Sequence, residues 1–460
     1  MKENIREILN RSYTILGAGR SGVGIARLLK RKGAKVFLSE NSPLDKLKYI
    51  DADALRLEKI EFETGGHSDR IYENDIFIKS PGIPMNSPEI LKALSLGKKV
   101  YGEIEAASWF CSCPIIAITG TNGKTTTTEL TGEIFRNAGF DIKVCGNVGL
   151  AFSEIVDTLK DNSVVVLELS SFQLESTESF RPKVSAILNL TPDHLEWHGS
   201  MEEYLKSKLK INSNQKDDDV VIINYDDSEL LNTIINLNAV KALFSVKKDL
   251  SKENLSISAY LENGSIIFSD KNSGLKEEII DVKDIFIKGN HNVQNSLAAI
   301  IAAKAFGIHK EVIKKTLSDF KGVEHRIEFV REINGVKFYN DSKATNLDSM
   351  TVAVESFPGN IVLILGGKKM INDFSKVKGL IKQRAKIIIA VGDSKKDVEK
   401  QLSQDMKVIV KDKFEDAIKS AYENSVSGDV VLFSPAYKSF DMFENFEHRG
   451  KEFKRIVNNL

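Results

Sequence analysis

A loop of small residues carries the clearest chemical signal in the sequence. Residues 120–126 read G-T-N-G-K-T-T, after the apolar run Ile115–Ile118 and before a helical pattern. Such a strand–loop–helix context suits phosphate, because glycines let backbone N–H groups turn toward an anion and a lysine can contact the β and γ phosphates. The Thr125 hydroxyl is a hard oxygen ligand suited to Mg²⁺. We therefore expect a nucleoside triphosphate to bind at Gly120, Thr121, Asn122, Gly123, Lys124, Thr125 and Thr126.

The spacing of this loop is shorter than usual. The common phosphate loop reads G-x-x-x-x-G-K-[ST], and Ile118 stands where its first glycine would fall. A threonine-rich helix cap without a ligand is the alternative. That alternative does not account for a Gly-Lys-Thr sequence at the start of a helix, so we favour a compact phosphate loop.

An acid and two histidines follow at the ends of later strands. Glu168 comes directly after the run Val164–Leu167, where a metal-binding acid would lie, although a solvated strand-end acid is the alternative. Residues 189–200 read N-L-T-P-D-H-L-E-W-H-G-S, and the Pro-Asp-His turn would lift His194 out of the sheet. His194 or His198 could serve a metal or phosphate, and the turn favours His194.

A second glycine motif lies near the N-terminus. The run Tyr13–Leu16 leads into G-A-G-R-S-G at 17–22, and Glu40 ends the next strand. This pattern satisfies the dinucleotide fingerprint, in which a helix N-terminus binds a pyrophosphate and an acid binds a ribose hydroxyl. Three interpretations stay open on these residues alone: an NAD(P) site, a tight turn that binds nothing, or a site for another diphosphate.

The pattern of elements that must position these residues is that of an α/β protein. Short β-branched runs alternate with helical patterns along most of the chain, which predicts parallel sheets. Between about 219 and 288 the pattern changes to short strands with turn signals, which predicts an antiparallel insert, and a helix is expected from about Asn292 to Phe306. The predicted strands are Tyr13–Leu16, Lys35–Leu38, Ile76–Ile78, Ile115–Ile118, Val164–Leu167, Val184–Leu188, Ile361–Leu365, Ile387–Val391 and Val430–Phe433.

Length and composition limit the classes of function. The 460 residues suggest roughly two to four domains. The net charge is zero, which disfavours a nucleic-acid partner, and no apolar run approaches the length of a membrane helix or a signal peptide core. Three cysteines fit a reducing cytoplasm, and Cys111 and Cys113 are expected to be plain thiols.

Several longer motifs resemble the Mur ligase family in order and spacing, and the resemblance covers essentially the whole chain. The shortened phosphate loop is similar to that of Mur ligases and folylpolyglutamate synthetases, which make amide bonds with ATP. The N-D-S-K-A-T-N and S-F-D-M-F-E-N-F-E-H-R-G sequences are the most specific. The motifs are G-T-N-G-K-T-T, L-E-L-S-S-F-Q-L-E at 167–175, N-L-T-P-D-H-L-E-W-H-G-S, G-N-H-N-V-Q-N-S-L-A-A at 289–299, H-R-I-E at 325–328, Y-N-D-S-K-A-T-N at 339–346 and F-S-P-A-Y-K-S-F-D-M-F-E-N-F-E-H-R-G at 433–450.

The resemblance implies three domains, each built on a mainly parallel sheet. A Rossmann-like UDP-substrate domain is expected at 1–102 and a central phosphate-loop ATPase domain with a small antiparallel sheet at 103–322. A Rossmann-like domain that binds the amino acid and closes over ATP is expected at 323–460. The first glycine motif would then hold the diphosphate of a UDP-sugar substrate.

The resemblance also implies a reaction and its partners. Within the family the motifs are closest to the ligases that couple D-glutamate to UDP-N-acetylmuramoyl-L-alanine in peptidoglycan synthesis. ATP would phosphorylate the alanine carboxylate, and the amine of D-glutamate would displace phosphate from the resulting acyl phosphate. Two Mg²⁺ ions, no nucleic acid, no membrane insertion and a monomer are expected.

Residue roles follow from matching each motif to the family. Lys124, Glu168, His194 and Lys208 would be catalytic, and Thr125, Glu168, His194 and Lys208 would hold metal. ATP would also contact Asn292, Asn295, Arg326 and Asp341. The UDP-substrate would contact Arg20, Ser21, Glu40, Asn41, Ser80, Gly82, Asn147, Ser170, Gln173 and His194. The amino acid would contact Lys343, Thr345, Ser439, Phe440 and Phe446, with Lys343 near the phosphates.

Lys208 is singled out among three lysines spaced by two. Lys206, Lys208 and Lys210 point in different directions on a helix, so at most one of them faces the site. The family pattern Y-x-x-x-K selects Lys208, four residues after Tyr204. In the family this lysine carries a carbamate formed from CO₂, which replaces a positive charge with a negative one.

One loop departs from the family pattern. The family often carries a basic residue just after the glycine pair at 366–367, where this chain reads G-G-K-K-M and places Met370. Lys368 or Lys369 could substitute, and strict selection of D-glutamate is in doubt to that extent. Three other classes stay open: a sister ligase, an NAD-dependent oxidoreductase and a nucleotide-binding protein without catalysis.

Overall fold

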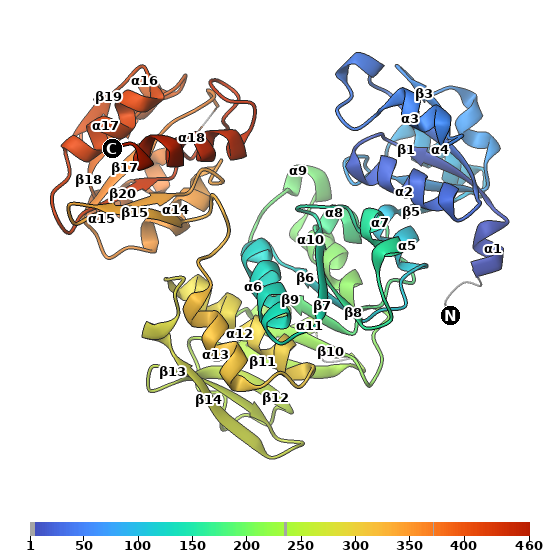
Figure 1. The fold of residues 1–460 in the computed structure, drawn as a ribbon, viewed down its shortest axis with the longest axis horizontal. Coiled ribbons are helices and arrows are strands. Elements are labelled where there is room, and N and C mark those ends of the chain that lie inside the picture. The colour runs from blue at the N-terminus through green and yellow to red at the C-terminus, as the bar shows by residue number, and fades with distance from the viewer. Residues whose placement is uncertain (1–4, 234–236, 371) are drawn as a thin grey trace. The chain divides into compact units, whose positions relative to one another are not determined.

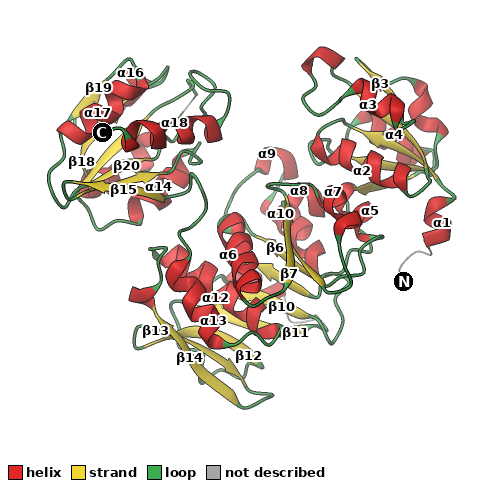
Figure 2. Cartoon of the chain, in the orientation of Figure 1, coloured by secondary structure: helices red, strands yellow, loops and turns green. Residues whose placement is uncertain are grey.

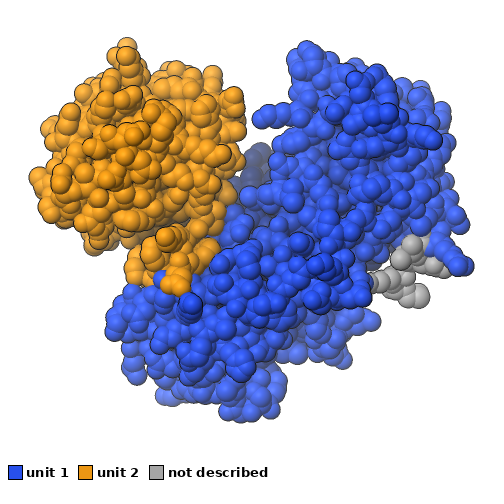
Figure 3. Space-filling model, viewed as in Figure 1, with its two compact units in different colours: residues 1–284, 293–318 blue, residues 285–292, 319–460 orange. Residues whose placement is uncertain are grey.

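The computed structural model describes residues 5–233, 237–370 and 372–460. These residues belong to two compact units, 1–284 with 293–318 and 285–292 with 319–460 (Figure 3). The first unit holds two sheets and the second holds one. Each of the ranges 1–102, 103–322 and 323–460 contains one sheet. The division of the chain into three domains at these boundaries remains a prediction.

The first sheet has five parallel strands (Figure 1). The strand order reverses between β1 and β4, and ligands of open α/β sheets bind beyond the carboxyl ends of the strands at such a point. The glycine motif follows the end of β1, so it lies at this switch. In spatial order the strands are β3 (Glu61–Thr64), β2 (Lys35–Glu40), β1 (Ser12–Leu16), β4 (Ile76–Lys79) and β5 (Lys99–Gly102).

The central sheet has nine strands and is mixed. Its strands from β12 to β7 run parallel, and the apolar residues of the inner strands β10, β9, β6 and β8 are buried, as expected for a parallel sheet covered on both faces. In spatial order the strands are β14 (Leu275–Asp281), β13 (Ser265–Asp270), β12 (Ile257–Glu262), β11 (Val240–Ser245), β10 (Val220–Asn224), β9 (Val184–Ile187), β6 (Ile115–Thr119), β8 (Ser163–Glu168) and β7 (Asp141–Gly146).

The antiparallel strands differ in one respect from the expectation. Strands β12, β13 and β14 pair antiparallel, but β12 also pairs with β11. These strands therefore extend the central sheet and do not form a separate small sheet. Backbone pairing to β11 satisfies the N–H and C=O groups that an isolated sheet would leave unpaired at its edge.

The third sheet lies in the second unit. Its strands are parallel except for β15, which forms a hairpin with β16. In spatial order they are β15 (Glu328–Ile333), β16 (Val336–Asn340), β20 (Val430–Phe433), β17 (Ile361–Leu365), β18 (Ala385–Ala390) and β19 (Val408–Val410). The three sheets with their covering helices confirm the predicted α/β class.

Helices alternate with the strands along the chain (Figure 2). Helices α2, α5 and α7 pack against one another, and one apolar core continues from the first sheet into the central sheet. The helices are α1 (Ile5–Leu9), α2 (Arg20–Arg31), α3 (Ala52–Leu57), α4 (Pro88–Ser95), α5 (Glu103–Ser108), α6 (Lys124–Asn137), α7 (Phe152–Ile155), α8 (Ser171–Leu174), α9 (Leu195–His198), α10 (Met201–Leu209), α11 (Ser228–Thr233), α12 (Asn290–Ala305), α13 (Lys310–Asp319), α14 (Leu347–Glu355), α15 (Lys378–Arg384), α16 (Lys395–Leu402), α17 (Phe414–Glu423) and α18 (Phe446–Asn458).

The three cysteines, Cys111, Cys113 and Cys145, are free and buried. Burial raises the pKa of the Cys145 thiol well above its ordinary value. Among the described residues, no helix combines the length and the apolar character needed to cross a membrane.

Candidate active site

The first glycine motif forms a tight turn between β1 and α2. Gly17 has a φ of +88°, and a Cβ atom on Gly22 would lie 1.8 Å from the Gly17 carbonyl oxygen, so both positions require glycine. The Ser80 hydroxyl at the end of β4 donates to the same carbonyl over 3.0 Å. The motif and Ser80 therefore lie together at the switch point of the first sheet.

Glu40 fixes this turn from the end of β2. Its carboxylate accepts hydrogen bonds from the backbone N–H groups of Ala18 (2.7 Å) and Ser42 (2.8 Å). Burial raises the pKa of Glu40, but these hydrogen bonds outweigh burial and leave the pKa below its ordinary value. The acid that the dinucleotide fingerprint assigns to a ribose is thus already engaged by the protein backbone. Asn41 beside it is exposed.

Arg20 links the glycine motif to the central sheet. Its guanidinium donates to the backbone carbonyl of Gly149, in the loop after β7, and lies over the Tyr49 ring. In the same loop the Asn147 side chain donates to Glu168 over 2.9 Å. A chain of contacts therefore runs from the α2 N-terminus to the buried carboxylate at the end of β8.

The central loop has the backbone of a phosphate site. Gly123 is left-handed at φ +82°, and its absent Cβ would lie 2.3 Å from the Asn295 side-chain oxygen. That oxygen also accepts a hydrogen bond from Thr127. The Lys124 ammonium donates to the carbonyls of Gly120 and Thr121, each over 2.8 Å. The lysine thus folds back over the loop in which a phosphate would bind.

Helix α10 places Lys208 against this loop. Its Nζ donates to the Gly120 carbonyl over 2.9 Å, and its side chain is buried. The pKa of Lys208 lies well below its ordinary value because of burial and then because of the Lys124 charge. Lys206 instead pairs with Glu202 and Glu203, and Lys210 donates to the Glu175 carbonyl. Only Lys208 among the three reaches the phosphate loop.

His194 and His198 lie around the Phe172 ring. His194 is left-handed at φ +52° and has an exposed side chain near Asp193, with 3.5 Å between Nε2 and a carboxylate oxygen. His198 stacks on Phe172 and hydrogen-bonds Ser171 over 3.0 Å, and burial lowers its pKa. The side chain of His194 is thus the more open to a ligand, and His198 is half-buried against Phe172 and Ser171.

Ser170 and Gln173 cap helix α8. The Ser170 hydroxyl accepts from the Gln173 backbone N–H, and the Gln173 side chain accepts from the Ser170 backbone N–H. This reciprocal cap fixes both side chains directly after the Glu168 strand. Ser21 lies in the first turn of α2, and Gly82 is exposed just after β4.

In the second unit, Asp341 organises the loop that carries Arg326. The Asp341 carboxylate accepts from Ser434 (2.7 Å) and from the backbone N–H of Ile327 (3.2 Å). His325 and Ile327 are left-handed at φ +64° and +46°, and a β-branched residue rarely adopts that conformation. Burial raises the pKa of Asp341 to about 7, against the effects of Ser434 and Arg326. The Asn292 side-chain amide donates a hydrogen bond to the Lys288 backbone carbonyl.

The residues predicted to receive the amino acid also lie in the second unit. The Lys343 ammonium lies 5.9 Å from the centre of the Phe446 ring, and Thr345 is half-buried. Ser439 is buried, whereas Phe440 is exposed. Lys369 pairs with Asp397 at 3.5 Å. The Lys368 backbone donates to the Lys438 carbonyl, which brings the ends of β17 and β20 together.

Comparison with known proteins identifies the family. Three family models match in chain order: the MurD N-terminal domain over 13–89, the Mur ligase middle domain over 118–303 and the Mur ligase, glutamate ligase domain, over 325–437. The UDP-N-acetylmuramoylalanine–D-glutamate ligase of Chloroherpeton thalassium is 42% identical, with 99% of each chain covered. The protein of that name from Clostridioides difficile is 40% identical, with 99% of this chain and 100% of the relative covered. The chain belongs to the Mur ligase family.

Solved structures agree with this Mur ligase in fold. The MurF ligase of Thermotoga maritima, determined with ADP, has a TM-score of 0.59 at 17% identity and covers 98% of this chain and 99% of its own. The MurC ligase of the same organism has a TM-score of 0.57 at 21% identity, covering 98% and 100%. As a family member the protein is an ATP-dependent ligase of peptidoglycan synthesis that uses Mg²⁺.

The donor atoms of this Mur ligase suit Mg²⁺ bound together with a nucleotide. Mg²⁺ in such sites takes few protein oxygens and completes its shell with water and substrate phosphates. The Glu168 carboxylate, oriented by Asn147, and the Thr125 hydroxyl in the first turn of α6 supply hard oxygens of this kind. Among the described residues no cluster of three or more His, Cys, Asp and Glu side chains could hold a metal ion by itself.

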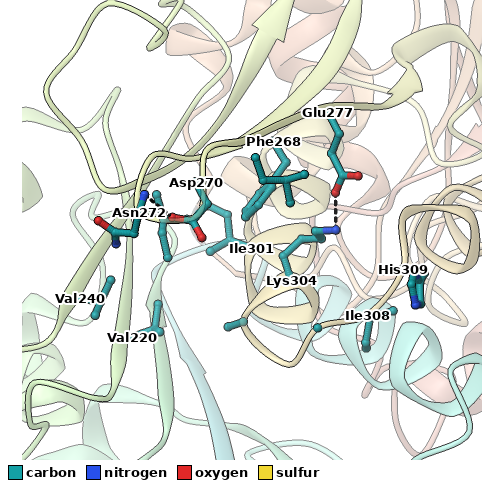
Figure 4. Close-up of a pocket in the computed structure, with 14 residues that line it drawn as sticks. Val220, Val240, Phe268, Asp270, Asn272, Glu277, Ile301, Lys304, Ile308 and His309 are labelled. Carbon is teal, nitrogen blue, oxygen red and sulfur yellow. Dashed lines mark hydrogen bonds and ion pairs between the residues drawn. The ribbon is translucent and has the colours of Figure 1, made fainter.

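A cavity of about 570 Å³ lies elsewhere in the central sheet of the Mur ligase (Figure 4). Val220, Val240 and Ile257 line it, and they are the first residues of parallel strands. The phosphate loop follows the last residue of β6, so the cavity lies at the opposite edge of the sheet. Lys304 and Glu277 form an ion pair at its wall. The cavity is not part of the phosphate site.

Several residues that build the site were not predicted from sequence. The Asn189 side chain accepts from the Asn122 backbone N–H over 2.8 Å, and the Tyr204 hydroxyl lies 3.2 Å from that of Thr121. In the second unit Ser434 donates to Asp341. Asn189 follows a predicted strand of the same sheet as the loop, and its place at the carboxyl edge could have indicated this contact.

Proposed function

We propose that this Mur ligase joins D-glutamate to UDP-N-acetylmuramoyl-L-alanine with hydrolysis of ATP to ADP and phosphate. The observation that carries the proposal is the identity of about 40% over nearly the whole chain with ligases named for this reaction. The first glycine motif would take the UDP-substrate, and the loop at 120–126 would take ATP. A monomer in the cytoplasm is part of the same proposal, and light scattering tests the monomer.

The chemistry requires activation of a carboxylate. A carboxylate oxygen is a poor leaving group, so the alanine carboxylate attacks the γ-phosphorus of ATP, ADP leaves and an acyl phosphate forms. The D-glutamate amine then attacks the carbonyl carbon, phosphate leaves and the amine loses a proton. Mg²⁺ supplies stabilisation of the charge that develops on oxygen. The Lys124 ammonium would move from the Gly120 and Thr121 carbonyls to the phosphates and act in the same way.

We also propose that Lys208 carries a carbamate. Its buried side chain and lowered pKa support this assignment, because only a neutral amine can form the N–C bond with CO₂ and release a proton. The product would replace a cation beside Lys124 with an anion that offers two hard oxygens to Mg²⁺. Incubation with ¹³C-bicarbonate should give a carbamate signal in the ¹³C NMR spectrum that Lys208→Ala lacks.

Phosphate release with UDP-N-acetylmuramoyl-L-alanine and a panel of D- and L-amino acids tests the reaction. Release with D-glutamate alone supports the proposal. Release only with L-alanine and UDP-N-acetylmuramic acid would assign the chain to the preceding step of the pathway. The panel also tests the 366–370 loop, since weak selection against other acidic amino acids would follow from the missing base at Met370.

A further inference from the structure

Glu175 receives contacts from three other elements of the first unit. It directly follows α8, and its Oε2 lies 3.9 Å from the Nζ atom of Lys79 at the end of β4. The Trp197 indole N–H on α9 donates to the same oxygen over 3.4 Å. The Lys210 ammonium, just after α10, donates to the Glu175 backbone carbonyl over 2.5 Å. One residue thus connects the first sheet with two helices of the central sheet.

Lys79 is the unusual member of this group. Its side chain has no exposed area, and its ammonium donates no hydrogen bond within the part of the chain that the structure describes. Burial lowers its pKa to about 8, opposed by Glu175 and supported by Lys210. Packing alone would be better served by an apolar side chain, because burial of a charge without hydrogen bonds is costly. The charge therefore calls for a role beyond packing.

The strand that ends at Lys79 leads directly to the substrate loop. Ser80, the next residue, hydrogen-bonds Gly17 at the switch point of the first sheet. A shift of Lys79 would therefore also move the serine that contacts the glycine motif.

The other contacts of Glu175 lead to the reaction centre. Trp197 lies on the helix that begins after His194, and its ring packs on Phe172 with centroids 4.6 Å apart. Lys210 lies two residues beyond Lys208, whose Nζ touches the phosphate loop. Glu175 thus restrains the segments that carry both His194 and Lys208.

We propose that Glu175, together with Lys79, is a positioning residue for the ligation reaction. The pair fixes the position of the strand end beside the UDP-substrate loop relative to helices α9 and α10. The carboxylate of the bound UDP-substrate would then lie close enough to the phosphate loop to react with ATP. The proposal rests on the proposed function. A displacement of about 1 Å can lower a rate roughly 100-fold without weakening the binding of either substrate, because the reacting atoms must be aligned.

Steady-state kinetics of the full chain test this role with three variants. Glu175→Gln keeps an acceptor for Trp197 but removes the charge that faces Lys79. Lys79→Met removes the cation and keeps a side chain of similar length. Glu178→Gln is the matched control, because Glu178 is exposed, lies three residues away and forms its hydrogen bonds with other described residues through its backbone N–H and carbonyl. Affinities for the UDP-substrate and for ATP are measured separately by calorimetry.

We expect kcat to fall roughly 10- to 100-fold in Glu175→Gln and in Lys79→Met, with both dissociation constants within about threefold of wild type. The kcat of the double variant should be no lower than that of the less active single variant, since the two residues act as one unit. Lys79→Met should have a lower kcat but the same or higher resistance to denaturant. A residue with a merely structural role would instead lower kcat and stability together. Glu178→Gln should match wild type.

Three results would overturn the role of Glu175. They are a wild-type kcat in Glu175→Gln, additive losses in the double variant, and a loss of kcat that accompanies equal losses of affinity and stability. Failure of the proposed function is seen separately, because the wild-type enzyme would then release no phosphate with D-glutamate.

Discussion

The side-chain nitrogen of Lys208 lies 2.9 Å from the backbone carbonyl oxygen of Gly120, the first residue of the phosphate loop. One turn earlier on the same helix face, the Tyr204 hydroxyl lies 3.2 Å from the Thr121 hydroxyl. Helix α10 therefore contacts two successive residues of the loop. The helix that carries the proposed carbamate is thus in direct contact with the proposed ATP site.

Removal of the Lys208 side chain should abolish ligation. We expect Lys208→Ala to lose nearly all phosphate release, and acetate or formate at high concentration to restore part of it by supplying the missing carboxylate oxygens. Lys206→Ala is the control, because Lys206 is exposed and paired with Glu202 and Glu203. It should stay active and show no response to the acid. Wild-type activity of Lys208→Ala in CO₂-depleted buffer would exclude the carbamate.

Replacement of Lys124 should impair the ATP site and leave the UDP-substrate site intact. Lys124→Ala removes the cation that can reach the phosphates, so ATP turnover should fall at least about 100-fold. UDP-substrate affinity should stay within a few-fold of wild type, because the glycine motif follows a strand of the other sheet. Calorimetry with each ligand checks both statements. An equal loss of both affinities would indicate a folding defect and contradict the assignment.

The first glycine motif should prefer uridine nucleotides. The chain is about 40% identical over nearly its whole length to ligases named for a UDP-substrate, and the Glu40 carboxylate, which would bind the ribose of NAD, already accepts hydrogen bonds from Ala18 and Ser42. We expect UDP to bind more tightly than NAD or NADP in parallel titrations. Gly22→Ala would place a methyl group against the Gly17 carbonyl and should weaken UDP binding by roughly tenfold or more. Gly379→Ala has open space at its Cβ and should not change it. Tighter binding of NAD would refute the assignment.

Lys79 should make stability depend on pH. Its folded pKa of about 8 lies below the ordinary value of 10.5, so the unfolded chain binds more protons between these values. The cost of the buried charge is complete below pH 8 and disappears as the pH rises toward 10.5. Lys79→Met should therefore be more stable than wild type at pH 7 by up to about 3 kcal/mol, with the gap closing by pH 10.5. Denaturation at both pH values measures it, and a less stable variant at pH 7 would contradict it.

Local sequence determined which features could be predicted. The phosphate loop was predicted because its chemistry lies in consecutive residues. Helical spacing indicated that at most one of three lysines faces the site, and the family pattern Y-x-x-x-K selected Lys208. The short strands β3 and β5 were missed, since each holds at most two apolar residues and lies at a sheet edge. The apolar runs of the central strands, in contrast, are long enough to be read directly.

Contacts between distant segments could not be predicted in this way. Glu40 was assigned to a ligand from its distance to the glycine motif, but its orientation toward Ala18 depends on how β1 and β2 pair. The partners of Glu175 come from positions 79, 197 and 210, which no local pattern brings together. The antiparallel strands were recognised as such, whereas their attachment to β11 is a property of the whole sheet.

The burial of all three cysteines makes the enzyme a convenient host for site-directed labelling. A maleimide reacts with an accessible thiolate, and Cys111, Cys113 and Cys145 are enclosed in the core, the last with a raised pKa. A thiol introduced at an exposed site such as Leu57 or Lys396 would thus be modified selectively without prior removal of native cysteines. Fluorophores at these two sites, one in each unit, would report the distance between the units in solution as nucleotide and UDP-substrate are added.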